Sequence, residues 1–191
     1  GTTGTPSYVG ITAHDRRIWI QAVARAYWAQ GLRPQSRLTM GFGMGFFVGG
    51  LPIAEAATEI GCTFIPVGTG ASDRLIAASA ALGADCLTCT PSYATYLAEY
   101  ARTRLDTDVA TLGLKHLFLG AEPGAGIPAV REHLGNTWKA QVSESVGNAD
   151  VMPIHSAECE LREGNHFLTP DFLVLEIIDP ETGTVKPLNA E

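Results

Sequence analysis

The sequence predicts an α/β protein: a layered, mostly parallel sheet with helices on both faces, followed by a β-rich tail. Its 191 residues, 46% of them hydrophobic, can bury a substantial core. Strand-like and helix-like segments alternate at least four times before residue 150, which is the pattern of parallel sheets. Helical periodicity then fades. We therefore expect an α/β core over residues 1–147 and a β-rich extension of the same large domain, forming a second sheet, over 148–191.

The helices are expected where apolar residues recur at helical spacing and glycine or proline marks an end. In the first, Ile18, Ala22, Ala26 and Ala29 share one face, and Gly31 follows as a cap. The helix at 51–61 ends at a glycine, the helix at 72–83 begins with Ser72 as N-cap, and the helix at 91–103 has a proline in its first turn. The predicted helices span residues 14–31, 51–61, 72–83, 91–103 and 127–135.

The strands are expected in short apolar runs between these helices. In the core they span residues 37–42, 62–67, 85–90, 114–122 and, running into a loop, 137–147. In the tail, short strand patterns cover 165–169, 172–178 and 183–188, and "DPETG" reads as a turn between the last two.

Glycine-rich or turn-forming segments follow four of the core strands. They read "GFGMGFFVGG", "VGTGAS", "TPSYA" and "GAEPGAG". Ligands of open parallel sheets bind at the carboxyl ends of the strands. The sequence therefore predicts one ligand site at one edge of the sheet.

Two glycine-rich segments, one at the start of the sequence and one after the first predicted strand, suggest what that ligand is. In "GTTGTP" at residues 1–6, backbone N–H groups and hydroxyls can converge on phosphate, although no P-loop lysine follows; the alternative is a turn-rich N-terminus. In "GFGMGFFVGG", glycines beside Phe42 and Phe47 suit a pocket for a small planar ring. The alternative there is a glycine-rich turn beside the core.

The composition disfavours nucleic acid and membrane as partners and indicates a cellular compartment. The net charge of −7 disfavours nucleic acid as a partner, and no apolar run reaches the roughly 18 residues that span a bilayer. The four cysteines indicate a reducing cytoplasm. Cys86 and Cys89 form a CxxC that we interpret as part of a strand, because it neither opens a helix nor has the second pair of a zinc knuckle.

The motifs "GTTGTPSYVG", "GFGMGFFVGG", "TPSYA" and "LGAEP", and the tail "VGNADV…AECE…GNHFL…EIIDPETG", resemble those of adenylate-forming enzymes of the phenylacetate–CoA ligase group. The resemblance implies that a small, aromatic carboxylic acid attacks ATP, with Mg²⁺, to give an acyl-adenylate that is passed to CoA. Family members continue on both sides of these motifs, so we expect the central part of a large N-terminal domain, inactive alone. A second copy of the chain is a candidate partner.

The resemblance also implies residue roles. The residues that hold phosphate would be Gly1, Thr2, Thr3, Gly4 and Thr5. Of these, Thr2 and Thr3 would be catalytic. The adenine and nucleotide contacts would be Gly120, Ala121, Glu122, Pro123, Val146, Gly147 and Asn148. Asp150 would be the catalytic carboxylate that binds Mg²⁺. The acid would contact Phe42, Phe47, Gly49, Gly50 and Tyr93. Val146 stands where the family has an aromatic residue, and Asp150 where it has glutamate.

Alternatives remain open on metal and function. His155, Glu158, Cys159 and His166 are candidate zinc ligands, against ordinary loop residues. One alternative function is a ligase-derived nucleotide- and acid-binding module without activity. Another is an adenylating enzyme that passes the acyl group to a carrier protein or an amine.

Overall fold

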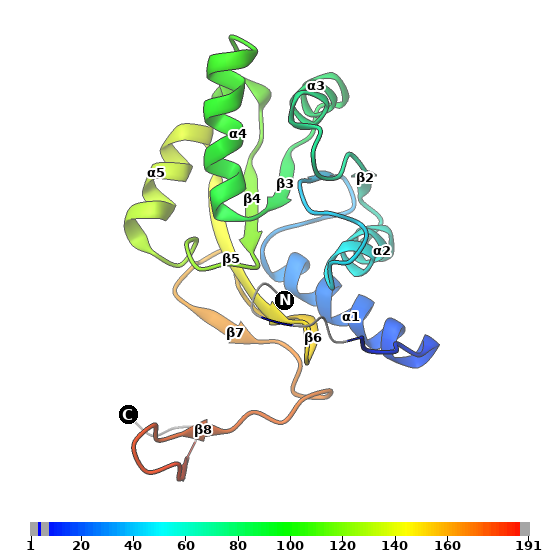
Figure 1. Ribbon diagram of the computed structural model, residues 1–191, viewed down its shortest axis with the longest axis vertical. Helices are drawn as coiled ribbons and strands as arrows, with labels where there is room; N and C mark the ends of the chain where they lie inside the picture. Colours follow the sequence, from blue (N-terminus) through cyan, green and yellow to red (C-terminus); the bar gives the residue numbers. More distant parts are fainter. Residues whose placement is uncertain (1–3, 5–7, 188–191) are drawn as a thin grey trace.

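The computed structural model describes residue 4 and residues 8–187, and its core is a seven-stranded mixed sheet (Figure 1). The strand order is β2-β1-β3-β4-β5-β6-β7. Neighbours from β2 to β5 are parallel, and β6 and β7 continue the sheet antiparallel. The strands are β1 Arg37–Met40, β2 Thr63–Ile65, β3 Cys86–Cys89, β4 His116–Gly120, β5 Gln141–Asn148, β6 Met152–Glu158 and β7 Asn165–Phe167. The predicted α/β sheet is confirmed.

Helices cover both faces of the sheet, as predicted. They are α1 Ala13–Ala29, α2 Gly50–Ile60, α3 Ser72–Leu82, α4 Pro91–Arg104 and α5 Pro128–Trp138, with a short 3₁₀ helix, η1, at Val109–Leu112. Alternate side chains of one strand enter different cores. Leu117 and Leu119 of β4 pack with α3, α4 and α5, whereas Phe118 packs with α1 and α2. The sheet is therefore the middle of three layers.

Local sequence signals fix most helix ends. Thr12 and Asp15 form a capping box at the start of α1. Gly61 and Gly83 end α2 and α3 in left-handed conformations, and Thr90 caps α4 ahead of Pro91. Ser72 is not the N-cap of α3: it is the first helical residue, and its hydroxyl instead lies 3.1 Å from that of Tyr93.

The tail differs from its prediction. Residues 152–158, for which no strand was predicted, form β6, which pairs with β5 in a hairpin. The tail strands β6 and β7 thus extend the main sheet. The separate sheet contains β8 Ile177–Ile178 and β9 Val185–Lys186, the strands at the two sides of the predicted turn (Figure 1). Thr137 and Trp138 belong to α5 instead of a strand.

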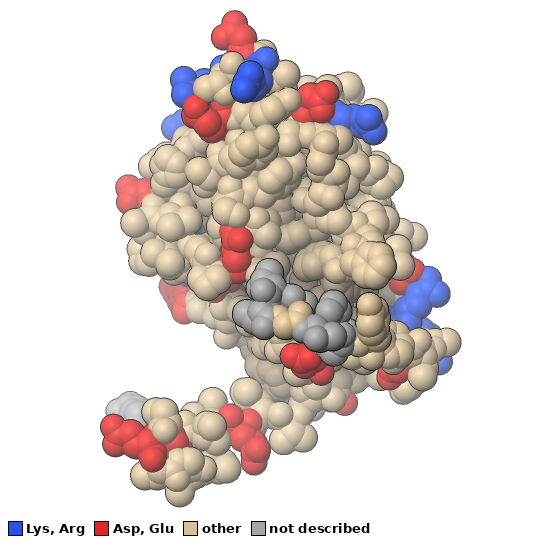
Figure 2. All heavy atoms as spheres, viewed as in Figure 1, with Lys and Arg blue, Asp and Glu red and all other residues tan. Residues whose placement is uncertain are grey.

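The centre of one face of the molecule carries few charged side chains. Figure 2 shows basic and acidic residues together at the end of the molecule formed by α3 and α4, and basic residues beside α1 and α2, with a mostly uncharged surface between them. Within the described residues, no helix has both the length and the apolar character needed to cross a membrane.

Candidate acid- and nucleotide-binding site

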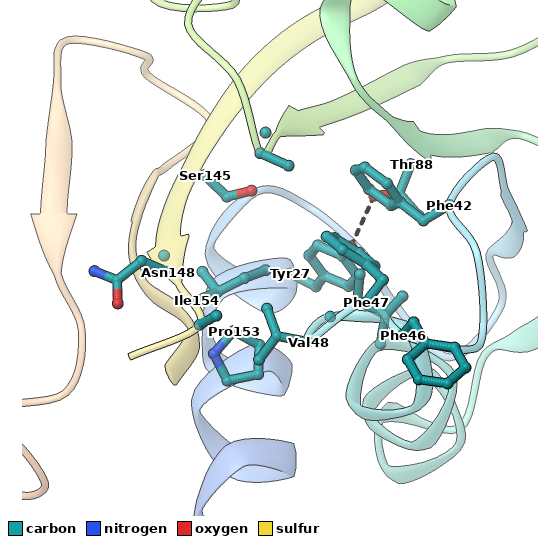
Figure 3. A pocket seen from close by; sticks show the side chains of 16 residues that line it. Tyr27, Phe42, Phe46, Phe47, Val48, Thr88, Ser145, Asn148, Pro153 and Ile154 are labelled. Carbon is teal, nitrogen blue, oxygen red and sulfur yellow. Dashed lines mark hydrogen bonds between the residues drawn. The ribbon is translucent and has the colours of Figure 1, made fainter. Parts of the chain in front are cut away.

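A cavity of about 370 Å³ opens at the carboxyl ends of the parallel strands (Figure 3). Its walls come from α1, the loop after β1, the start of α2, β3, the end of β4, and the β5–β6 hairpin. The lining residues are Tyr27, Phe42, Phe46, Phe47, Val48, Gly49, Ile53, Thr88, Gly120, Ala121, Ser145, Gly147, Asn148, Ala149, Pro153 and Ile154. Its volume lies in the range of small-molecule sites.

The loop after β1 supplies an aromatic wall. The rings of Phe42 and Phe47 are stacked with centroids 4.9 Å apart. Phe46 is fully exposed at the mouth, with its backbone in the left-handed region (φ 53°). An offset aromatic pair of this kind presents a flat apolar surface to a planar ligand.

Two hydroxyls lie at the closed end of the cavity. The Tyr27 and Thr88 oxygens are 2.8 Å apart, and both side chains are buried (Figure 3). Burial raises the pKa of Tyr27 well above its ordinary value, so the phenol stays protonated and neutral.

The ends of β4, β5 and β6, which line the cavity, approach one another closely because two of their glycines have no side chain. A Cβ at Gly120 would lie 2.7 Å from the Ser145 carbonyl oxygen of the neighbouring strand. A Cβ at Gly147, which lies in a register irregularity of β5, would collide with the Pro153 carbonyl of β6. Backbone of β4, β5 and β6 therefore forms one side of the cavity.

A second, more open cleft of about 610 Å³ adjoins the first and shares Phe42, Phe47 and Ala121 with it. It adds Thr69 from the loop after β2, and Tyr93 and Tyr96 from the first two turns of α4. The four segments singled out in the sequence thus meet at one edge of the sheet, as predicted, and the ligand site there stays a prediction.

Hydrogen bonds hold the β4–α5 loop, residues 121–127, against its surroundings. Glu122 accepts from the Ser92 backbone N–H at 2.6 Å, and Glu144 accepts from that of Gly126 at 2.9 Å. Arg131 donates to the Ala125 carbonyl at 2.8 Å. These bonds fix Ala121, whose left-handed backbone (φ 68°) places it in the walls of both cavities.

The structure brings together most of the predicted acid contacts and part of the predicted nucleotide contacts. Phe42, Phe47, Gly49, Gly120, Ala121, Gly147 and Asn148 line the first cavity, and Tyr93 lines the adjoining cleft. Gly50 is buried where α2 begins, and a Cβ there would lie 2.5 Å from the Gly43 carbonyl oxygen. It shapes the loop without lining either cavity.

The other predicted nucleotide contacts that the structure describes lie outside the cavity walls. Glu122 is held by α4, as described above, and Pro123 is exposed next to it. Val146 is on β5 opposite Ser156, with 39% of its surface exposed. Gly4 is exposed; Gly1, Thr2, Thr3 and Thr5 lie outside the described residues.

Asp150, the predicted Mg²⁺ ligand, is in the exposed turn of the β5–β6 hairpin. The Asn148 carboxamide oxygen accepts from the backbone N–H groups of Asp150 and Val151 at 3.0 and 2.9 Å. The Asn148 side chain points away from the cavity in Figure 3. One exposed carboxylate is chemically suited to a Mg²⁺ ion that takes its remaining ligands from phosphate and water.

The four candidate zinc ligands do not form a metal site. Glu158 is buried and bound to Arg131, His155 lies beside Ser156, and His166 is exposed on β7. Across residue 4 and residues 8–187, no three His, Cys, Asp or Glu side chains are grouped so as to hold a metal ion. His155 and Glu158 are strand residues of β6, not the loop residues of the alternative expectation.

Several lining residues were missed from the sequence. Tyr27 and Ile53 look like ordinary core positions of helices, and Thr88 like an ordinary strand residue. Ser145, Pro153 and Ile154 belong to the hairpin that was not predicted. Only the position of Thr88, two residues before the "TPSYA" loop, gave a signal that could have identified it.

Comparison with known proteins finds relatives that share one name. No protein-family model matches the chain. The chain is 35% identical over 189 residues to a phenylacetate–coenzyme A ligase of Thermus thermophilus and 30% identical over 185 residues to that of Escherichia coli. It spans about two-fifths of the length of these curated relatives: 98% of the chain aligns with 42% of the Thermus protein.

Solved structures agree with these sequence matches. A 2-hydroxyisobutyryl-CoA ligase crystallised with 2-HIB-AMP and CoA superimposes with a TM-score of 0.88 and 29% identity, over 97% of this chain and 39% of that one. A long-chain-fatty-acid–CoA ligase from Archaeoglobus fulgidus shares the fold, with a TM-score of 0.67 and 17% identity over 91% of this chain and 36% of that one. Over about two-fifths of their length, phenylacetate–coenzyme A ligases are therefore homologues of this chain, and its structural neighbours are acyl-CoA ligases.

Proposed function

We propose that this chain is the acid- and nucleotide-binding core of an AMP-forming acid–CoA ligase. It would activate a small aromatic carboxylic acid with ATP to an acyl-adenylate, releasing pyrophosphate, and the CoA thiol would then displace AMP. The observation that carries the proposal is the first cavity, where the aromatic loop, the β4 end and the β5–β6 hairpin converge. These are the segments in which the resemblance placed acid and adenine.

The division of roles follows from the chemistry of the walls. The Phe42 and Phe47 rings would hold the acyl group, and the backbone around Gly120 and Gly147 would face the nucleotide. Asp150 is the proposed Mg²⁺ ligand, and the ion would neutralise phosphate charge. Thr2 and Thr3 remain the proposed phosphate contacts. The contribution of this chain is to position the reactants and exclude water.

The surrounding organisation is proposed on the same basis. Residues 1–147 would form the α/β core and 148–191 its extension, with further segments of the natural polypeptide on either side. Four free thiols, three of them buried, favour a reducing cytoplasm. A homodimer remains a proposal. Nucleic acid is not proposed as a partner, given the net charge of −7, and a membrane is not proposed because no apolar run reaches the roughly 18 residues that span a bilayer.

ATP–pyrophosphate exchange in the full natural polypeptide that carries this sequence tests the proposal. We expect exchange that depends on an aryl acid and on Mg²⁺, and a loss of at least about tenfold in Asp150→Ala. Glu59→Ala, which removes an exposed carboxylate from α2 outside both cavities, is the control. An enzyme that shows no exchange with any acid would contradict the proposal.

The same experiment also tests the two alternative functions, one of which is favoured by a specific residue. Val146 in place of an aromatic residue favours a binding module without activity, which would bind ATP and acid in calorimetry without exchanging pyrophosphate. Transfer to a carrier protein or an amine would give exchange without a CoA thioester. Measuring binding, pyrophosphate exchange and formation of the CoA thioester therefore distinguishes the three functions.

A further inference from the structure

We propose that the cavity selects acids whose ring carries a hydrogen-bonding substituent, such as a hydroxyl, and that Tyr27 and Thr88 recognise that group. This rests on the proposed acid-activating function and names its substrate class. Three features of the described residues lead to it: the orientation that the cavity imposes, the hydroxyls at its closed end, and their unused hydrogen-bonding capacity.

The cavity has an open end and a closed end. Phe46, Asn148 and Ala149 are exposed and mark the mouth. Tyr27 and Thr88, each about 1% exposed, mark the buried end. A ligand that fills the cavity must direct one end of its structure toward these two hydroxyls.

The acid can enter in one orientation. None of the sixteen lining residues, all of them described, carries a charge. Burying a carboxylate in such a wall would leave it without a counter-charge, at a large cost in free energy. The carboxylate therefore stays at the mouth, near the strand ends, and the ring goes in first.

The hydroxyl pair has capacity left for a ligand. Tyr27 and Thr88 share one hydrogen bond, which uses one of their two O–H protons. Among the described residues, neither side chain makes another hydrogen bond. One O–H donor and several lone pairs thus remain at the wall of an apolar cavity, where unpaired polar groups are costly.

An entering ring substituent that can donate and accept would satisfy both needs. A ring hydroxyl could accept the spare O–H proton and donate its own proton to the hydroxyl oxygen of Tyr27 or Thr88. A methyl group of similar size would fill the same space and leave the donor unpaired. Sites with a buried polar group discriminate strongly against analogues that lack the matching group.

Matched acids test this in the full natural polypeptide. We would measure kcat/KM for pyrophosphate release, and Kd by calorimetry, with the three ring isomers of hydroxyphenylacetate and of methylphenylacetate. We expect at least one hydroxy isomer to exceed its methyl counterpart about tenfold in both measurements. In Tyr27→Phe and Thr88→Val that ratio should fall toward one, whereas Thr88→Ser should retain it.

The control is Thr39→Val, which removes a buried hydroxyl from the neighbouring strand β1 outside the cavity and should leave the ratio unchanged. Equal values for hydroxy and methyl acids in the wild type, or a ratio that survives both Tyr27→Phe and Thr88→Val, would overturn the inference. Failure of the proposed function is distinct: it would appear as no pyrophosphate release with any acid, while the Kd ratio still decides the inference.

Discussion

One guanidinium nitrogen of Arg131 lies 2.7 Å from each carboxylate oxygen of Glu158, joining α5 to β6 across 27 residues of sequence. Only 5% of the Glu158 side chain and 21% of the Arg131 side chain are exposed. The same carboxylate accepts from the Glu144 backbone N–H at 2.8 Å, and Arg131 also donates to the Ala125 carbonyl. This pair therefore ties the β4–α5 loop to the edge of the sheet that forms the cavity.

Removing one member of this pair should be costly. We expect Arg131→Gln to lower the free energy of unfolding by about 3 kcal/mol, because the Glu158 carboxylate would stay buried without its partner. Arg102→Gln, which breaks an exposed pair with Glu99 on α4, should cost less than about 1 kcal/mol. Urea denaturation measures both, and equal losses would contradict a structural role for the buried pair.

A methyl group at Gly147 should distort the β5–β6 hairpin. Since its Cβ would collide with the Pro153 carbonyl, we expect Gly147→Ala to lose about 2 kcal/mol of stability and to weaken binding of ATP. Gly45→Ala, in the loop after β1 with open space around its Cβ position, is the control and should be tolerated. Thermal unfolding and calorimetry test this; a Gly147→Ala protein as stable as Gly45→Ala would refute it.

Thiol labelling should separate Cys159 from the other three cysteines. Burial raises the pKa of Cys62 to about 11 and those of Cys86 and Cys89 further, so their thiolates are scarce at pH 8. Cys159 is partly exposed. Iodoacetamide followed by mass spectrometry should modify Cys159 first in the native protein and all four in urea. Rapid native labelling of Cys86 or Cys89 would show that the sheet core is open.

His116 should make stability fall in mild acid. Burial lowers its pKa below the ordinary 6.5, although Asp85 and Glu160 oppose the shift and Lys115 and Arg33 add to it. Below pH 6.5 the unfolded state therefore binds more protons than the folded state, and the free energy of unfolding falls as pH decreases. His116→Gln should show a smaller loss between pH 7.5 and pH 5.5, measured by urea denaturation. An identical loss would exclude this histidine as a cause.

Sequence patterns predicted the parallel core well because its signals are local. Gly61 and Gly83 end helices, Pro91 begins one, and the alternation of strands and helices fixes the order of layers. Phe42 and Phe47 could be assigned to a ring pocket because glycines surround them. These features depend on backbone conformation and periodicity, which neighbouring residues reveal.

Long-range pairing could not be predicted in the same way. The strand β6 carries polar residues such as His155 and Ser156, and its place is set by pairing with β5 across the hairpin. Tyr27 and Thr88 are 61 residues apart, and only the packing of α1 under the sheet brings their hydroxyls together. Glu158 resembled a metal ligand until its partner on α5 was known.

The most direct test of the central claim is a crystal structure of the full natural polypeptide with a non-hydrolysable aryl-acyl-adenylate analogue. We predict the aryl ring between Phe42, Phe47 and Ile154, with the adenosine against the strand ends at Gly120 and Gly147. An analogue bound elsewhere, with this cavity filled by side chains, would contradict the claim that this edge of the sheet holds acid and nucleotide together.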